Sequence, residues 1–266
     1  MQARKETKLK NDFISGHKEQ YSCIGYCSVF VCKKIQKHYY GFTVTNYIIN
    51  GGKKLKGEIT VNASKNSAVA ILLASLLNDG KTTIINLPKI EEVSRIIEIL
   101  ESVGVKTAWQ GKALKISPPE KLKLEKLDIE AALKTRTMVL LIGILIHKFK
   151  KFSLPFSGGC KLGKRTVTPH IYALENFGIK IKVKEEAYEI SRNKLVPCEK
   201  IIMYESGDTA TENAILAAAL IDGKTVIKFA SANYQVQDLC HFLVGLGVKM
   251  EGIGTTTLTI FGRENL

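Results

Sequence analysis

The sequence predicts a mixed α/β protein of the α+β kind, an inside-out α/β barrel in which sheets surround buried helices. The first observation is an internal repeat, since Leu77–Thr82 (LNDGKT) recurs as Leu220–Thr225 (LIDGKT). Gly104–Lys106 recurs as Gly247–Lys249 at the same displacement, and a more divergent third copy ends at Phe177–Lys180. The second observation is that each copy holds a helix too apolar to face water. The third is a β-branched strand after the Asp-Gly turn of the first and last copies. The domain is therefore expected to contain three copies of one unit.

Each copy is expected to run from an apolar helix through a strand and an amphipathic helix to one or two closing strands. In the first copy the amphipathic helix carries its apolar residues at helical spacing and ends at Gly104, which is placed as its C-terminal cap. The expected apolar helices are Asn66–Leu77, Ala131–Ile146 and Glu212–Leu220. The other expected elements are strands Lys81–Asn86 and Lys224–Phe229, helix Glu91–Val103, and closing strands Val105–Trp109, Ala113–Ile116, Lys249–Gly252 and Thr256–Phe261.

Length and composition indicate a globular cytoplasmic protein. The 266 residues, 45% of them hydrophobic, are enough for a substantial core. The longest apolar runs, Ala68–Leu77 and Met138–Ile146, are too short to cross a bilayer, and the N-terminus has no ordered signal-peptide pattern. Six cysteines spread over this length do not form a disulfide framework, so we expect reduced thiols.

The net charge of +14 is compatible with a nucleic acid, a membrane surface or an anionic small substrate as partner. The lysines are spread along the whole chain and are not interleaved with aromatic residues in an RNA- or DNA-binding motif. Nucleic acid is therefore the less favoured partner, and we expect no membrane partner.

Residues 1–45 differ from the regular part of the chain, residues 46–266. They are rich in Lys, Tyr and Cys, show no sustained helical or strand period, and are expected to form an extension of unknown role. The three repeats are expected at about 57–118, 128–190 and 200–262. The extension holds several potential zinc ligands, but their spacing fits no common pattern, so no metal site is expected there. These ligands are Cys23, Cys27, Cys32, His17 and His38.

The middle copy carries an insertion that the other copies lack. The segment from Pro155 to Gly178 is seven residues longer than the equivalent segment of the first copy, from Pro88 to Gly104. The extra residues fall at Gly158–Lys164. An insertion confined to one repeat usually forms a functional loop. This loop, Ser157–Arg165, places Cys160 among Lys161, Lys164 and Arg165, which would favour a thiolate. Cys160 is therefore the candidate catalytic residue, as a nucleophile or an acid.

The N-termini of the three apolar helices are expected to gather at one end of the domain. Free N–H groups and the helix dipoles make such an end suited to phosphate or carboxylate. Arg136 interrupts an otherwise apolar run, where a charge needs a partner. The residues expected there are Lys65, Asn66, Lys134, Arg136 and Ser206-Gly207-Asp208-Thr209.

The order and spacing of these motifs resemble those of UDP-N-acetylglucosamine 1-carboxyvinyltransferase, the enolpyruvyl transferase that begins peptidoglycan synthesis. The resemblance spans about Asn46 to Leu266. It is carried by Gly57–Val61, Ala63–Ala68, Lys134–Arg136, Gly158–Cys160 with Gly163 and Arg165, His170, and Ala210–Asn213. The related shikimate-pathway transferase shares the fold, but its glycine-rich phosphate motif has no counterpart here.

The resemblance implies transfer of the enolpyruvyl group of phosphoenolpyruvate to the 3′-hydroxyl of UDP-N-acetylglucosamine, with release of phosphate and without a metal or organic cofactor. Cys160 would be the proton donor that can form an adduct with phosphoenolpyruvate. Lys65 and Asn66 would lie at the enolpyruvate site, with Arg136 and Arg165 near the charged groups of the ligands. The further implied substrate-binding positions are Val167, Ser206 and Gly207.

The chain also departs from the family pattern. Ser157 replaces the usual Pro before Gly-Gly-Cys, Thr166 and Thr168 replace the Pro and Asp of an Arg-Pro-Val-Asp run, and Glu205–Asp208 lacks the usual Lys and Ser. The family has a second domain of the same kind that completes the active site, and this sequence covers only the first. We therefore expect a fragment or a half-enzyme completed by a separately encoded partner. The alternative is a non-catalytic basic protein that binds nucleotides or nucleic acid.

The missing domain has one structural consequence. By resemblance, Asn46–Ile49 is a strand that crosses to the second domain. Without that partner, its edge is expected to be unpaired unless the extension covers it.

Overall fold

The computed structural model describes residues 21–22, 28–39, 42–54, 56–156 and 166–266. Its contacts divide these residues into two units, one within His17–Asn62 and the other from Ala63 to Leu266. No helix among the described residues is long and apolar enough to span a membrane.

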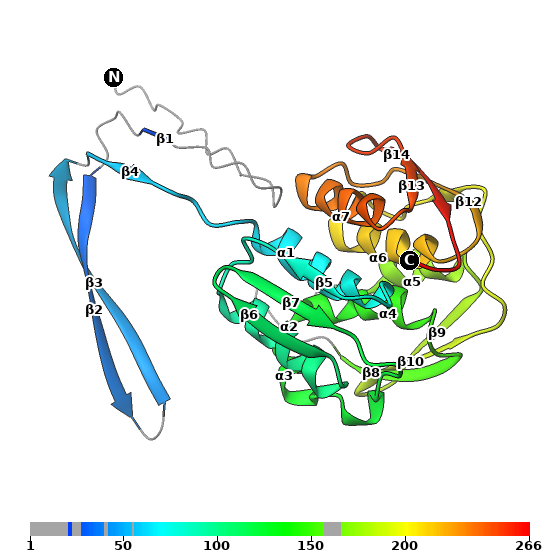
Figure 1. Ribbon diagram of the computed structural model, residues 1–266, viewed down its shortest axis with the longest axis horizontal. Helices are drawn as coiled ribbons and strands as arrows, with labels where there is room; N and C mark the ends of the chain where they lie inside the picture. Colours follow the sequence, from blue (N-terminus) through cyan, green and yellow to red (C-terminus); the bar gives the residue numbers. More distant parts are fainter. Residues whose placement is uncertain (1–20, 23–27, 40–41, 55, 157–165) are drawn as a thin grey trace. The chain divides into compact units, whose positions relative to one another are not determined.

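The larger unit contains three small sheets of the same topology (Figure 1). In each, the strand that comes last in the sequence lies between the other two and pairs antiparallel with both. The third sheet adds β11 (Ile201–Ile202), which runs parallel to its first strand. In spatial order the sheets are β5 (Thr82–Ile84), β7 (Ala113–Ser117) and β6 (Lys106–Gln110); β8 (Lys151–Pro155), β10 (Ala187–Arg192) and β9 (Ile179–Val183); and β12 (Gly223–Lys228), β14 (Thr257–Gly262) and β13 (Lys249–Glu251). The predicted three-copy α/β architecture is confirmed.

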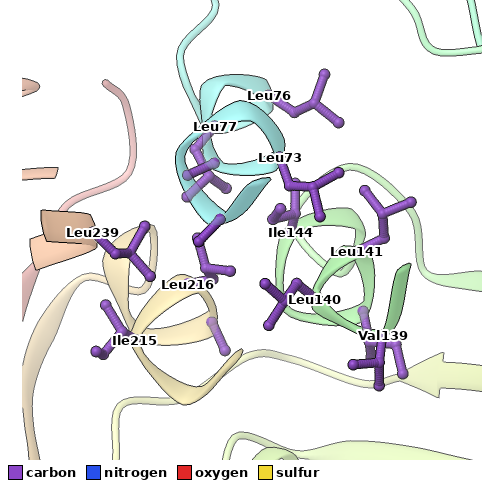
Figure 2. Packing of buried hydrophobic residues seen from close by; sticks show 14 of the residues in the cluster. Leu73, Leu76, Leu77, Val139, Leu140, Leu141, Ile144, Ile215, Leu216 and Leu239 are labelled. Atoms are coloured by element: carbon purple, nitrogen blue, oxygen red, sulfur yellow. The ribbon is translucent and has the colours of Figure 1, made fainter. Parts of the chain in front are cut away.

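Two of the three predicted central helices form as expected. One is α1 (Lys65–Ala74), which continues into a 3₁₀ turn at Ser75–Leu77, and the other is α6 (Asp208–Ala219). Both are buried along almost their whole length, and Figure 2 shows Leu77, Leu140 and Leu216 pointing into the space between the three central segments. Outside them lie α2 (Glu91–Ser102), α5 (Thr168–Glu175) and α7 (Tyr234–Gly245). Helices therefore occupy the inside and sheets the outside.

The middle copy does not form the single helix predicted at Ala131–Ile146. It is split into α3 (Ile129–Leu133), a 3₁₀ turn at Arg136–Leu140 and α4 (Leu141–Leu145). The break lies at Thr135, whose backbone is extended with φ −129° and ψ 133°. The Thr135 hydroxyl donates a hydrogen bond to the carboxylate of Glu92 on α2, and so does the Thr137 hydroxyl. These side-chain hydrogen bonds fix a backbone conformation that is incompatible with one continuous helix.

Asn213 on α6 supplies hydrogen bonds next to this break. Its side-chain amide donates to the Val139 carbonyl at 2.9 Å, and its side-chain oxygen accepts from the Gly143 N–H at 2.8 Å. A Cβ at Gly143 would lie 2.4 Å from that oxygen, so the close approach requires glycine. One buried polar side chain therefore joins the middle and third copies.

The strands and the amphipathic helix lie where the sequence predicts them, with ends that differ by at most two residues. The apolar stripe of α2 is buried, and Gly104 follows the helix with a φ of 102°. The first strands of the first and third copies end before Asn86 and Phe229, which have φ values of 55° and 59°. Equivalent positions of two copies thus share the same uncommon left-handed conformation. The repeat in the sequence is also a repeat in backbone geometry.

The smaller unit contains a long antiparallel hairpin, β2 (Ser28–Tyr39) with β3 (Phe42–Lys54), and a short pair, β1 (Tyr21–Ser22) with β4 (Glu58–Ile59). Residues 1–45, in which the sequence shows no sustained strand period, thus contain regular strands. The extension pairs with Asn46–Ile49 through residues 32–35, so the exception stated for this edge applies. The predicted boundary between residues 45 and 46 falls inside β3, and the domain ranges stay a prediction.

Candidate functional site

A cavity of about 1260 Å³ opens where the central segments begin. Five of the predicted substrate-binding residues line it, and they come from all three copies. They are Lys65, Asn66, Arg136, Ser206 and Gly207. Val167 does not line the cavity; it is half-buried against the core just before α5, while its neighbour Thr166 does line it. Cys160 and Arg165 lie outside the described residues.

The first-copy wall of the cavity is built around Glu92, which the sequence did not identify as a site residue. Its carboxylate is 2.6 Å from the Lys65 ammonium and accepts a hydrogen bond from the Thr137 hydroxyl at 3.0 Å. Burial acts to raise the pKa of Glu92, but the bonds from Lys65 and Thr137 outweigh it and hold the pKa below its usual range. An anionic ligand that binds Lys65 would therefore compete with an ionised carboxylate.

Other cations at the cavity are also paired. Lys134 contacts Glu130, and Arg95 bonds Glu98 at 2.8 Å. Arg136 begins the 3₁₀ turn of the middle copy, and its charge acts on His170. The cavity thus presents positive charge that is already partly balanced by neighbouring carboxylates.

The third-copy wall begins at Gly207, the N-cap of α6. The next residue, Asp208, has a carboxylate that accepts hydrogen bonds from Ser231 (2.5 Å), Asn233 (2.8 Å) and Gln235 (2.5 Å). Sequence reasoning placed Asp208 near the helix start but missed these partners, although the polar run that contains them was a usable signal. The Asp208 carboxyl group is thus held in place by three side-chain donors at the N-terminus of α6.

The Asp208 network also reaches the first copy. Gln235, on α7, accepts a hydrogen bond from the side-chain amide of Asn66 at 3.3 Å. The predicted ligand residue Asn66 is therefore positioned by α7, and the beginnings of α1, α6 and α7 are tied together around the cavity.

His170 is a buried neutral residue behind the cavity. Burial, and then the charge of Arg136, lower its pKa to about 4. The Asn213 amide lies 3.2 Å from its Nδ1, and the Thr209 hydroxyl lies 3.3 Å from its Nε2. Because the amide is a donor, Nδ1 accepts and Nε2 carries the proton. His170 therefore orients its neighbours and is not placed to act as a general acid.

Glu212 lies one turn after Asp208 on α6 and lines the cavity, although only 3% of its surface is exposed. Burial, and then the charge of Asp208, raise its pKa to about 8. The sequence places it in a motif but gives no sign of this environment. Among the described residues, no group of three or more His, Cys, Asp or Glu side chains could hold a metal ion.

The arrangement suits a small ligand that carries both negative charge and hydroxyl groups. The beginnings of the central helices and several cations favour phosphate or carboxylate. The polar side chains of the third-copy wall can exchange hydrogen bonds with hydroxyls.

Comparisons with known proteins agree with the fold. Residues 49–266 match the family model described as EPSP synthase (3-phosphoshikimate 1-carboxyvinyltransferase). The chain is 37% identical to UDP-N-acetylglucosamine 1-carboxyvinyltransferase of Borreliella burgdorferi, over 83% of this chain and 51% of that protein. It is 36% identical to the protein of that name from Bradyrhizobium diazoefficiens, with the same coverage. The chain thus spans about half the length of the curated relatives it matches.

Solved structures show the same fold. The enolpyruvyl transferase NikO from Streptomyces tendae superposes with a TM-score of 0.65 at 20% identity, over 75% of this chain and 47% of that one. EPSP synthase from Acinetobacter baumannii superposes with a TM-score of 0.61 at 15% identity, over 78% of this chain and 47% of that one.

Proposed function

Because this chain belongs to the EPSP synthase family of enolpyruvyl transferases, we propose that it serves enolpyruvyl transfer to the 3′-hydroxyl of UDP-N-acetylglucosamine. The donor is phosphoenolpyruvate, the other product is phosphate, and the setting is cytoplasmic peptidoglycan synthesis. The choice of this acceptor rests on the curated relatives, which carry the name of that reaction at 36–37% identity.

The observation that carries the proposal is the cavity at the beginnings of the three central segments. It gathers Lys65 and Asn66 from the first copy, Arg136 from the second, and Ser206 and Gly207 from the third. These are the positions that the family motif assigns to substrate binding, and they come together although they are far apart in sequence. Positive charge near a developing phosphate anion lowers the free energy of the transition state.

In this proposal Cys160 protonates the enol carbon of phosphoenolpyruvate while the sugar hydroxyl adds to the adjacent carbon. Arg136 and Arg165 hold the anionic groups of the ligands, and Val167 contributes a substrate contact beside the loop. Loss of phosphate and of a proton then restores the double bond in the product. An acid set among cations is what this sequence of steps needs.

The relatives are about twice as long as this chain, and we propose that residues equivalent to their unmatched half complete the site. These residues could be supplied by a separate polypeptide. The isolated chain would then bind the nucleotide sugar weakly without turnover, since closure around the ligands and a positioned base each contribute large rate factors.

Phosphate release in the presence of both substrates tests the proposal. We expect no measurable release by the isolated chain, and release when the unmatched half of a relative is added as a separate polypeptide. Cys160→Ala or Arg136→Ala should abolish the restored release. Arg263→Ala should not, because Arg263 does not line the cavity and bonds the Gly247 carbonyl. Robust release by the isolated chain would contradict the need for a second half, and failure to restore release by any relative would contradict the assigned reaction.

A further inference from the structure

Glu212 is a buried carboxyl group at the cavity that the proposed reaction leaves without a role. Only 3% of its surface is exposed, and it nevertheless lines the cavity. Among the described side chains, none donates a hydrogen bond to it. A buried polar group in native proteins almost always has a hydrogen-bond partner. Among the described residues, the buried side-chain N and O atoms without a partner do not include the Glu212 oxygens, so these oxygens are accessible from the cavity. The molecule that fills the cavity is placed to be their partner.

The surroundings of Glu212 do not compensate a negative charge. Asp208, on the same helix, accepts hydrogen bonds from three side chains, and its charge acts to raise the pKa of Glu212. Cys240, on α7, is a buried thiol whose pKa is raised to about 12 by burial and then by Glu212. The other charged groups that line the cavity are Lys65, Glu91, Glu92, Arg95, Lys134, Arg136 and Glu205.

Three of the four cations that line the cavity pair with other carboxylates, and Asp208 is the charged group that acts on Glu212. Lys65 pairs with Glu92, Arg95 with Glu98, and Lys134 with Glu130. Burial beside Asp208 therefore favours the neutral form of Glu212, and its pKa of about 8 has this cause. A neutral carboxyl group can donate one hydrogen bond, whereas a carboxylate can only accept.

We propose that Glu212 is a ligand-contacting residue that binds in its uncharged form and donates its carboxyl proton in a hydrogen bond to an anionic oxygen of the bound ligand. The inference rests on the proposed function for the identity of that ligand, a phosphate- or carboxylate-bearing substrate. The same side chain in its charged form would repel the ligand, so Glu212 makes binding depend on protonation.

The sign of the pH effect follows from this role. Only the protonated form binds well, so affinity is full below about pH 8 and falls as the pH rises above it. One pH unit above the pKa leaves about one tenth of the sites protonated, so affinity falls about tenfold. Glu212→Gln keeps a hydrogen-bond donor of similar size and cannot ionise, so its affinity should not fall in this way.

Calorimetric titration of the full chain between pH 7 and pH 9 tests the proposal with two probes, UDP-N-acetylglucosamine and inorganic sulfate. The wild-type protein should bind each about tenfold more weakly at pH 9, and Glu212→Gln should change less than about twofold. Glu205→Gln is the matched control, since it removes another carboxylate from the third-copy wall. It should keep the wild-type fall in affinity.

The two probes separate this inference from the proposed function. If the nucleotide sugar binds with the same pH dependence in wild type and Glu212→Gln, the role of Glu212 is overturned and the proposed function stands. If sulfate binds with the expected dependence and the nucleotide sugar does not bind, the role of Glu212 stands and the proposed substrate is wrong. If neither probe binds, both are overturned.

Discussion

Gly143 is a single residue on which the junction of two copies depends. A Cβ there would lie 2.4 Å from the Asn213 side-chain oxygen and 2.6 Å from its backbone carbonyl. We expect Gly143→Ala to lower the free energy of unfolding by about 1–3 kcal/mol, because the backbone has to move. Gly245→Ala is the control, since its Cβ would meet nothing within 4 Å and alanine favours a helix by about 0.5–1 kcal/mol. Urea denaturation measures both changes, and an equal effect at the two sites would contradict the packing argument.

The protonation of Glu212 also predicts how stability depends on pH. Its pKa is raised from 4.5 to about 8 in the folded chain, so the folded state binds more protons than the unfolded state between these values. This contribution to stability is full below pH 4.5 and is lost as the pH rises through 8. His170 acts in the opposite direction, since its lowered pKa removes stability as the pH falls from 6.5 towards 4. Urea denaturation between pH 6.5 and 8.5 should show a loss of stability that Glu212→Gln lacks, and parallel curves would contradict the assignment.

Cysteine reactivity is predicted from the same local chemistry. Cys240 is buried, and burial and then Glu212 raise its pKa to about 12, so it should resist alkylation in the folded protein. Cys198 is half-buried. Cys160 lies outside the described residues and keeps its predicted role as the most reactive thiol, because cations flank it in the sequence. Limited alkylation followed by mass spectrometry tests this, and faster labelling of Cys198 would count against the assignment of Cys160.

At the scale of elements, the split middle helix depends on α6. Asn213→Ala removes the partners of the Gly143 N–H and the Val139 carbonyl, which are buried. We expect a loss of about 1–3 kcal/mol for each group left without a partner. Asn176→Ala is a matched control, because its amide bonds the Tyr172 and Ala173 carbonyls at the end of a helix and is more exposed. Thermal unfolding of both variants provides the comparison, and equal losses would show that the bonds of Asn213 are not specifically needed.

At the scale of the whole molecule, the hairpin of the smaller unit predicts a pattern of hydrogen exchange. Asn46–Ile49 pairs with residues 32–35. The backbone amides that donate hydrogen bonds across the hairpin should therefore exchange more slowly than the same amides in an unpaired strand. Removing residues 1–39 deletes the partner strand and should make these amides exchange faster. Exchange measured by mass spectrometry tests this, and identical rates in the two chains would show that the pairing is not maintained in solution.

The sequence by itself determined the three-copy architecture and several of the residues at the cavity. The apolar helices, the Asp-Gly turns and the glycine after α2 are local signals, and local signals can be recognised from neighbouring residues. The same signals overestimated the middle helix, because an apolar run does not show where side chains will compete for the backbone. Tertiary structure alone decided the break at Thr135, the pairing of Lys65 with Glu92 and the burial of Glu212 beside Asp208. Each depends on groups from different elements that only folding brings together, and on burial, which no single stretch of sequence specifies.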